Sequence, residues 1–128
     1  MKKRILLLAS IIPSLIFAQS LSLSWQQGDI PNNSSITIPG IPSDPVLNSH
    51  IFVTNNTSST IDVKVKKVEL SLVAGSMNTF CWGICFPPDV YVSPDPLPIG
   101  PGATNTDDFI GDYFSNGNLG ASIIRYVF

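Results

Sequence analysis

Residues 80–86 read Phe80-Cys81-Trp82-Gly83-Ile84-Cys85-Phe86 and contain both cysteines and one of the two tryptophans of the chain. On an extended strand, residues four apart are separated by about 13 Å, whereas a disulfide requires Cα atoms within about 7 Å of each other. A bond between Cys81 and Cys85 therefore requires a bend, and Gly83 is the residue that permits it. We expect a short-range disulfide here, which does not tie two sheets together.

Two other uses of these cysteines stay open. Redox-active pairs usually have two intervening residues and a following helix, whereas this pair has three and is followed by Pro87-Pro88. A soft-metal site is the second alternative, because Met77, Cys81 and Cys85 together offer a thioether and two thiolates to Cu(I). In an exported protein with only two cysteines, the disulfide is the simplest outcome.

On both sides of this stretch, apolar and polar residues alternate with the period of two that is typical of β-strands. The alternation is clearest over 21–25 and 61–65, and 50–54 is a compact apolar strand. Further candidate strands are 36–38, 106–113 and 121–128, the last with Ile124, Tyr126 and Phe128 on one face. After Lys67 the apolar positions shift by one residue, which predicts a bulge or a change of sheet at Lys66-Lys67. Lys64, Lys66 and Lys67 are accordingly expected on the solvent-exposed face of one strand.

Turn signals separate these candidate strands at intervals of about ten residues. The prolines of 39–46 predict an ordered crossing loop, and Asn55 begins a turn over 55–59 because its side chain can bond to its own backbone. The sequence therefore predicts an all-β fold, an antiparallel sandwich of about seven strands. A small barrel is the structural alternative.

The N-terminal residues resemble a signal peptide. Lys2, Lys3 and Arg4 precede an apolar run over 5–17, and Ala18 is a small residue at the expected cleavage position. The run is shorter than the roughly 20 residues that a spanning helix needs. We expect residues 1–18 to be removed, which leaves one exported domain over 19–128 without a membrane span.

The charge of residues 19–128 excludes one class of partner. This part has four basic and nine acidic side chains, so its net charge is −5. Proteins that bind nucleic acids need clustered Lys and Arg to displace the counterions of the phosphates. Nucleic-acid binding is therefore not expected.

The sequence lacks the patterns of the common catalytic and cofactor sites. His50 is the only histidine, and no nucleophile elbow, zinc-protease or phosphate-loop pattern occurs. Neither an enzyme nor a cofactor is therefore expected. Aromatic side chains are the candidates for a binding surface, and those near the cysteines are Trp82, Phe86 and Tyr91.

Several segments together resemble an immunoglobulin-like module of secreted Bacteroidota-type proteins. They are 50–55, 61–65, 80–85, 99–102 and 120–126. The resemblance implies a non-catalytic β-sandwich in which a further strand follows the equivalent of Tyr126, often with a C-terminal sorting domain for type IX secretion. The sequence ends at Phe128 with neither. We therefore expect that the last strand is missing, or that a partner adds one at residues 121–128.

These observations predict a non-catalytic module that acts outside the cytoplasm, in the periplasm, at the cell surface or beyond it. Its expected role is interaction with a protein or a glycan at the cell surface, or structural spacing within a longer protein. The alternative is a periplasmic copper-binding domain that uses Met77, Cys81 and Cys85.

Overall fold

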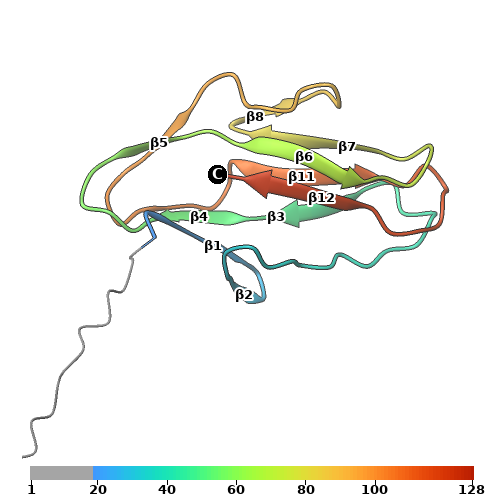
Figure 1. Cartoon of the computed structure of the whole chain (residues 1–128), viewed down its shortest axis with the longest axis horizontal. Coiled ribbons are helices and arrows are strands. Elements are labelled where there is room, and N and C mark those ends of the chain that lie inside the picture. Colours follow the sequence, from blue (N-terminus) through green and yellow to red (C-terminus); the bar gives the residue numbers. More distant parts are fainter. Residues whose placement is uncertain (1–18) are drawn as a thin grey trace, which may run out of the picture.

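The computed structural model describes residues 19–128, and the predicted signal peptide lies outside them. Twelve short strands and no helix form this described part (Figure 1). Nor does it contain a helix that could cross a membrane. The strands are β1 (Leu21–Trp25), β2 (Gly28–Ile30), β3 (Leu47–His50), β4 (Phe52–Asn55), β5 (Ile61–Val63), β6 (Lys66–Ser71), β7 (Met77–Trp82), β8 (Ile84–Phe86), β9 (Leu97–Ile99), β10 (Thr104–Asn105), β11 (Phe109–Phe114) and β12 (Ile123–Val127).

All strand pairs are antiparallel, and two four-stranded sheets dominate. One has the order β10-β4-β1-β2 and the other the order β3-β11-β7-β8. Two further pairs, β12-β6 and β5-β9, complete the arrangement (Figure 1). The predicted all-β, sandwich-like fold is confirmed. The strands outnumber the seven expected because two long segments are divided between sheets and because β2, β9 and β10 form outside the predicted strands.

The segment 47–55 is one such divided segment. The sequence predicts a single strand over 50–54, but the chain leaves one sheet after β3 and enters the other as β4. Ile51, at the junction, is buried. The predicted strand over 36–38 does not form, and β2 pairs with β1 instead.

The segment 61–71 is also divided, because β5 pairs with β9 whereas β6 pairs with β12. The predicted change of sheet is therefore present, between Val63 and Lys66, but the alternative prediction of a bulge at Lys66-Lys67 is wrong. Val63, Val65 and Lys67 are all buried, so the inward alternation continues through the lysine. The irregularity lies later: Ile123 and Ile124 face Ser71 and Glu69, which leaves Leu70 without a partner.

Lys67 is therefore not on the wet face where the sequence places it. Only 1% of the residue is exposed. Its ammonium group donates to the carbonyl oxygens of Pro88 (2.8 Å) and Asn78 (3.2 Å). A buried lysine is tolerated when its nitrogen donates hydrogen bonds to such acceptors. Here the acceptors belong to segments that only the folded chain brings together.

Aromatic rings fill the space between β12 and the sheet that contains β7 and β11. Phe109 is fully buried, and its ring contacts those of Tyr126 and Phe128 with centroids 4.9 Å away in both cases. Phe80 packs against Phe86 at 5.2 Å. The expected inward face of residues 121–128 is thus confirmed, since Ile124, Tyr126 and Phe128 are all more buried than their neighbours.

Candidate functional site

The segment 80–86 forms a tight hairpin. β7 and β8 pair antiparallel with Cys81 opposite Cys85, and Gly83 is the one residue between the paired positions. Its φ of 74° lies in the left-handed region, where a side chain is unfavourable. The bend predicted at Gly83 is present, and it brings the two cysteine Cα atoms to 3.8 Å. The two sulfurs form a disulfide within one sheet.

The predicted copper set is not assembled. The sulfurs of Cys81 and Cys85 are bonded to each other, so neither is a thiolate. Met77 lies on the same strand, opposite Phe114, four residues before Cys81. Within the described residues, no group of three His, Cys, Asp or Glu side chains is placed to hold a metal ion.

The predicted aromatic binding surface needs a correction. Trp82 is 2% exposed and Phe86 9%, because their rings face the core from the paired strands β7 and β8. The indole of Trp82 donates to the carbonyl of Val63 at 2.9 Å, which satisfies its only polar group. Tyr91 alone is available to a partner, at 47% exposed.

The disulfide is expected to contribute modestly to stability. Replacing both cysteines by alanine should lower the free energy of unfolding by about 2 kcal/mol, because the loop that it closes is short. Urea unfolding of the wild type and of the C81A/C85A variant measures this difference. Loss of the folded state in the variant, or free thiols in the unreduced wild type, would contradict the assignment of a local stabilising bond.

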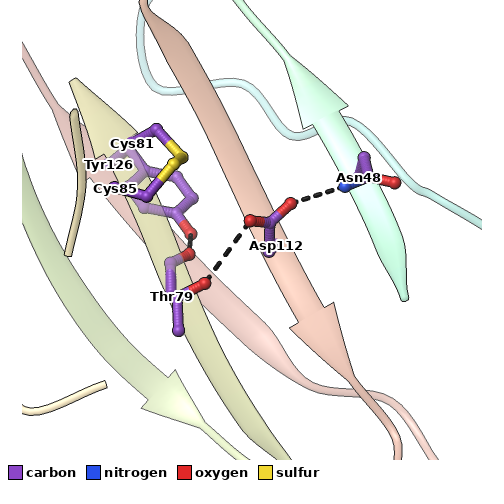
Figure 2. Close-up of a disulfide and its surroundings, with 6 residues drawn as sticks. All are labelled: Asn48, Thr79, Cys81, Cys85, Asp112 and Tyr126. Carbon is purple, nitrogen blue, oxygen red and sulfur yellow. Dashed lines mark hydrogen bonds between the residues drawn. A yellow bond between two sulfur atoms is a disulfide. The ribbon is translucent and has the colours of Figure 1, made fainter. Parts of the chain in front are cut away.

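A polar chain crosses the strands beside the disulfide (Figure 2). The hydroxyl of Tyr126 donates to the carbonyl of Thr79, the Thr79 hydroxyl donates to Asp112, and Asp112 also accepts a bond from Asn48. The phenol ring lies against β11 at Gly111, where an added Cβ would come within 2.9 Å of the hydroxyl oxygen. Glycine is therefore required there to admit the ring.

Burial, followed by the nearby Asp112 and Glu69 carboxylates, raises the pKa of Tyr126 well above its ordinary value of 10.0. The neutral phenol is thus stabilised in the folded state. Its contribution to stability is fully present below about pH 10, the unfolded value, and is lost as the pH rises above it.

Alkaline unfolding therefore tests the position of Tyr126. The wild type should lose stability between about pH 8 and about pH 11, and Y126F should lose less, because it keeps the ring without the titrating hydroxyl. The urea unfolding midpoints of both proteins at the two pH values measure these losses. Subtracting the loss in Y126F from the loss in the wild type removes the contributions of all other titrating groups. Equal losses in the two proteins would contradict the buried phenol.

The surface has a cleft of about 320 Å³. Four separate segments line it, from β1, from the loop after β2, from β3 and β4, and from the loop before β11. The lining residues are Trp25, Gln26, Ile38, Asn48, Ser49, His50, Phe52, Thr106 and Asp107. Aromatic and apolar surface thus lies beside amides, hydroxyls, one imidazole and one carboxylate.

The polar groups of the cleft are not arranged as a catalytic triad. The hydroxyl of Ser49 donates to the Gly111 carbonyl at 3.2 Å. In the described part of the chain, no hydrogen bond joins His50 to Ser49 or to Asp107. Such links are what activate a serine nucleophile.

The sequence does not predict this cleft. Trp25 and His50 have no features in the sequence that connect them with each other or with Asp107. A lone histidine at the start of a strand and a half-buried tryptophan are ordinary features of a β-domain.

Comparison with known proteins supports the fold. No protein-family model matches the chain, and no curated protein matches it. A solved structure described as the N-terminal domain of PorA is similar over 73% of this chain and 69% of that chain, with a TM-score of 0.52 and 18% sequence identity. At this identity the likeness concerns the fold alone, and the chain is thus similar in its all-β architecture to the N-terminal domain of PorA.

Proposed function

We propose that the chain is an exported, non-catalytic binding module, immunoglobulin-like as its sequence resemblance implies, and that it binds its ligand in the cleft at Trp25. One observation carries this proposal: the cleft combines aromatic surface with several uncharged hydrogen-bonding side chains. Binding sites typically combine a mainly apolar lining with a few polar groups that fix orientation. Export is supported by the signal-peptide pattern of residues 1–18 and by a disulfide, which persists in oxidising compartments.

A neutral glycan is the ligand class that this lining suits best. The flat face of a tryptophan can cover the apolar face of a sugar ring, and Gln26, Asn48 and Thr106 can bond to hydroxyl groups. Asp107 and the net charge of −5 over 19–128 disfavour acidic sugars.

Screening the full chain against an array of neutral, acidic and amino-containing oligosaccharides tests the proposal. We expect binding to neutral members, loss of at least ~10-fold in affinity in W25A, and no change in Y91A, an exposed aromatic outside the cleft. Binding that depends on Tyr91 but not on Trp25, or binding to no oligosaccharide, would reject the cleft as a glycan site.

A protein partner at the free edge of β12 is the second proposal. Within residues 19–128, β12 pairs with β6 only, so its other edge is open to an added strand at residues 121–128. Ile123 and Val127, on the outer face of β12, are exposed. Size-exclusion chromatography with light scattering, with and without an added peptide strand, tests this proposal. We expect the chain to self-associate or to bind the added strand. A monodisperse monomer that melts cooperatively and binds no added strand would contradict it.

A further inference from the structure

Three polar side chains gather inside the domain, away from the cleft. Lys67 and Glu69 come from β6 and Asn78 comes from β7, which belongs to a different sheet. Lys67 and Asn78 are each 1% exposed. A buried lysine and a buried amide therefore lie beside the carboxylate of Glu69, whose side chain is 25% exposed, at a site for which the binding proposal has no use.

One carboxylate oxygen connects the other two groups. The Oε1 atom of Glu69 accepts a hydrogen bond from the Asn78 amide nitrogen at 2.7 Å and lies 3.8 Å from the Lys67 ammonium nitrogen. The lysine Nζ also donates to the backbone carbonyl of Asn78 at 3.2 Å. The amine and the side-chain amide are thus held next to each other, with a proton acceptor common to both.

Burial shifts the Lys67 amine toward its uncharged, nucleophilic form. Burial lowers the pKa of the amine, against the opposing attraction of Glu69 and Asp89. The rings of Tyr91 and Phe80 lie near the nitrogen, with centroids 4.9 and 6.0 Å away. Lysine acts as a nucleophile when such desolvation leaves it unprotonated.

The side-chain amide of Asn78 is hydrogen-bonded through its nitrogen but not through its oxygen. Oδ1 is a buried side-chain atom with no hydrogen-bond partner among the described residues. Orphaned buried oxygens are rare and costly in folded proteins. This atom is therefore free to accept a proton or to carry the negative charge that develops when a nucleophile attacks the adjacent carbon.

We propose that Lys67 and Asn78 join through an intramolecular isopeptide bond, with Glu69 as the proton carrier. The Lys67 Nζ attacks Cγ of Asn78, and a C–N bond forms. Glu69 accepts a proton from the attacking nitrogen and delivers it to Nδ2, whose bond to Cγ then breaks. Ammonia leaves, and no oxidant or other reactant is needed.

The bond would tie together two parts of the sandwich that the disulfide does not. Cys81 and Cys85 lie within one sheet, whereas β6 and β7 belong to different ones (Figure 1). A covalent link between sheets limits the separation of the layers during unfolding. Such a link suits a module exposed to mechanical force or proteolysis outside the cell.

Mass spectrometry of tryptic fragments tests the proposal directly on the exported chain. Lys67 and Arg125 are consecutive cleavage sites, and trypsin does not cut after an acylated lysine. After reduction of the Cys81–Cys85 disulfide, we expect a fragment that contains residues 67–125 and is lighter than its sequence by one ammonia molecule. A fragment 68–125 of full sequence mass would overturn the proposal.

Three variants separate this reaction from other losses of ammonia, such as ring closure at Asn116-Gly117. K67M, which lacks the amine, and E69Q, which lacks the proton carrier, should both keep their full mass. N78D should lose water instead and reach the wild-type product mass. A loss of ammonia that persists in K67M would overturn the proposal, and so would an unaltered loss in E69Q.

Discussion

Replacing Trp82 by alanine is expected to lower the free energy of unfolding by about 3–5 kcal/mol, as measured by urea denaturation. The side chain is almost fully buried, its ring meets that of Phe128 edge-on at 6.0 Å, and its N–H satisfies the Val63 carbonyl. The substitution leaves a large cavity and an unpaired buried carbonyl. Since small domains are stable by only about 5–15 kcal/mol, this loss threatens folding itself.

Two further variants separate packing from local effects in the hairpin. W82F keeps most of the ring but not the hydrogen bond, so a smaller loss of about 1–3 kcal/mol is expected. I84A truncates the neighbour directly opposite, which is 69% exposed, and should change stability by no more than about 0.5 kcal/mol. A loss in I84A that equals the loss in W82A would contradict the assignment of Trp82 to the core.

The second large effect is expected at Asn55, whose side chain is fully buried at the end of β4. Its amide nitrogen donates to three backbone carbonyls, at distances of 2.7–3.0 Å, and its oxygen accepts from both the amide and the hydroxyl of Thr57. The three carbonyl oxygens belong to Ser59, Ile99 and Gly100. Asn55→Ala leaves these groups unpaired and should cost roughly 3 kcal/mol in thermal or urea unfolding.

The matched control for this network is Asn55→Asp, which has the same size. It replaces the donor by a carboxylate oxygen that faces carbonyl oxygens, so we expect a loss at least as large as in the alanine variant. Full stability of the aspartate variant near neutral pH would show that the amide does not hold the loops together.

Local features of the fold were accessible from the sequence. The bend at Gly83 follows from the reach of a disulfide and the conformational freedom of glycine, both of which depend on only five residues. The turn after Asn55 is likewise local, and its predicted bond appears between Oδ1 and the amide of Thr57 at 2.9 Å. Strand β1 forms over the predicted residues because its alternation is regular.

Lys67 shows why other features were not accessible. Read by residue type, a lysine between Lys66 and Val68 marks a solvent-exposed position. Its burial depends on carbonyl acceptors at Asn78 and Pro88, which are 11 and 21 residues away in sequence. No local pattern encodes such partners. The error in phase followed from this one residue.

The cleft could not be predicted for a related reason. Trp25, His50 and Asp107 come from segments that only the strand order brings together, and the division of 47–55 between sheets places His50 in its lining. Residue type instead pointed to Trp82 as a binding group. The same aromatic character that suits a ligand site also suits a core, and burial decides between them.

The central claim is that ligand binding occurs at the cleft and that the 80–86 hairpin serves the core. Titrating the ¹⁵N-labelled chain with the best-binding neutral oligosaccharide and following amide and indole shifts by NMR tests this claim most directly. We expect changes at the Trp25 indole and at the amides of His50 and Asp107. Changes centred instead on Tyr91 and the 80–86 hairpin, with the Trp25 indole unmoved, would contradict it.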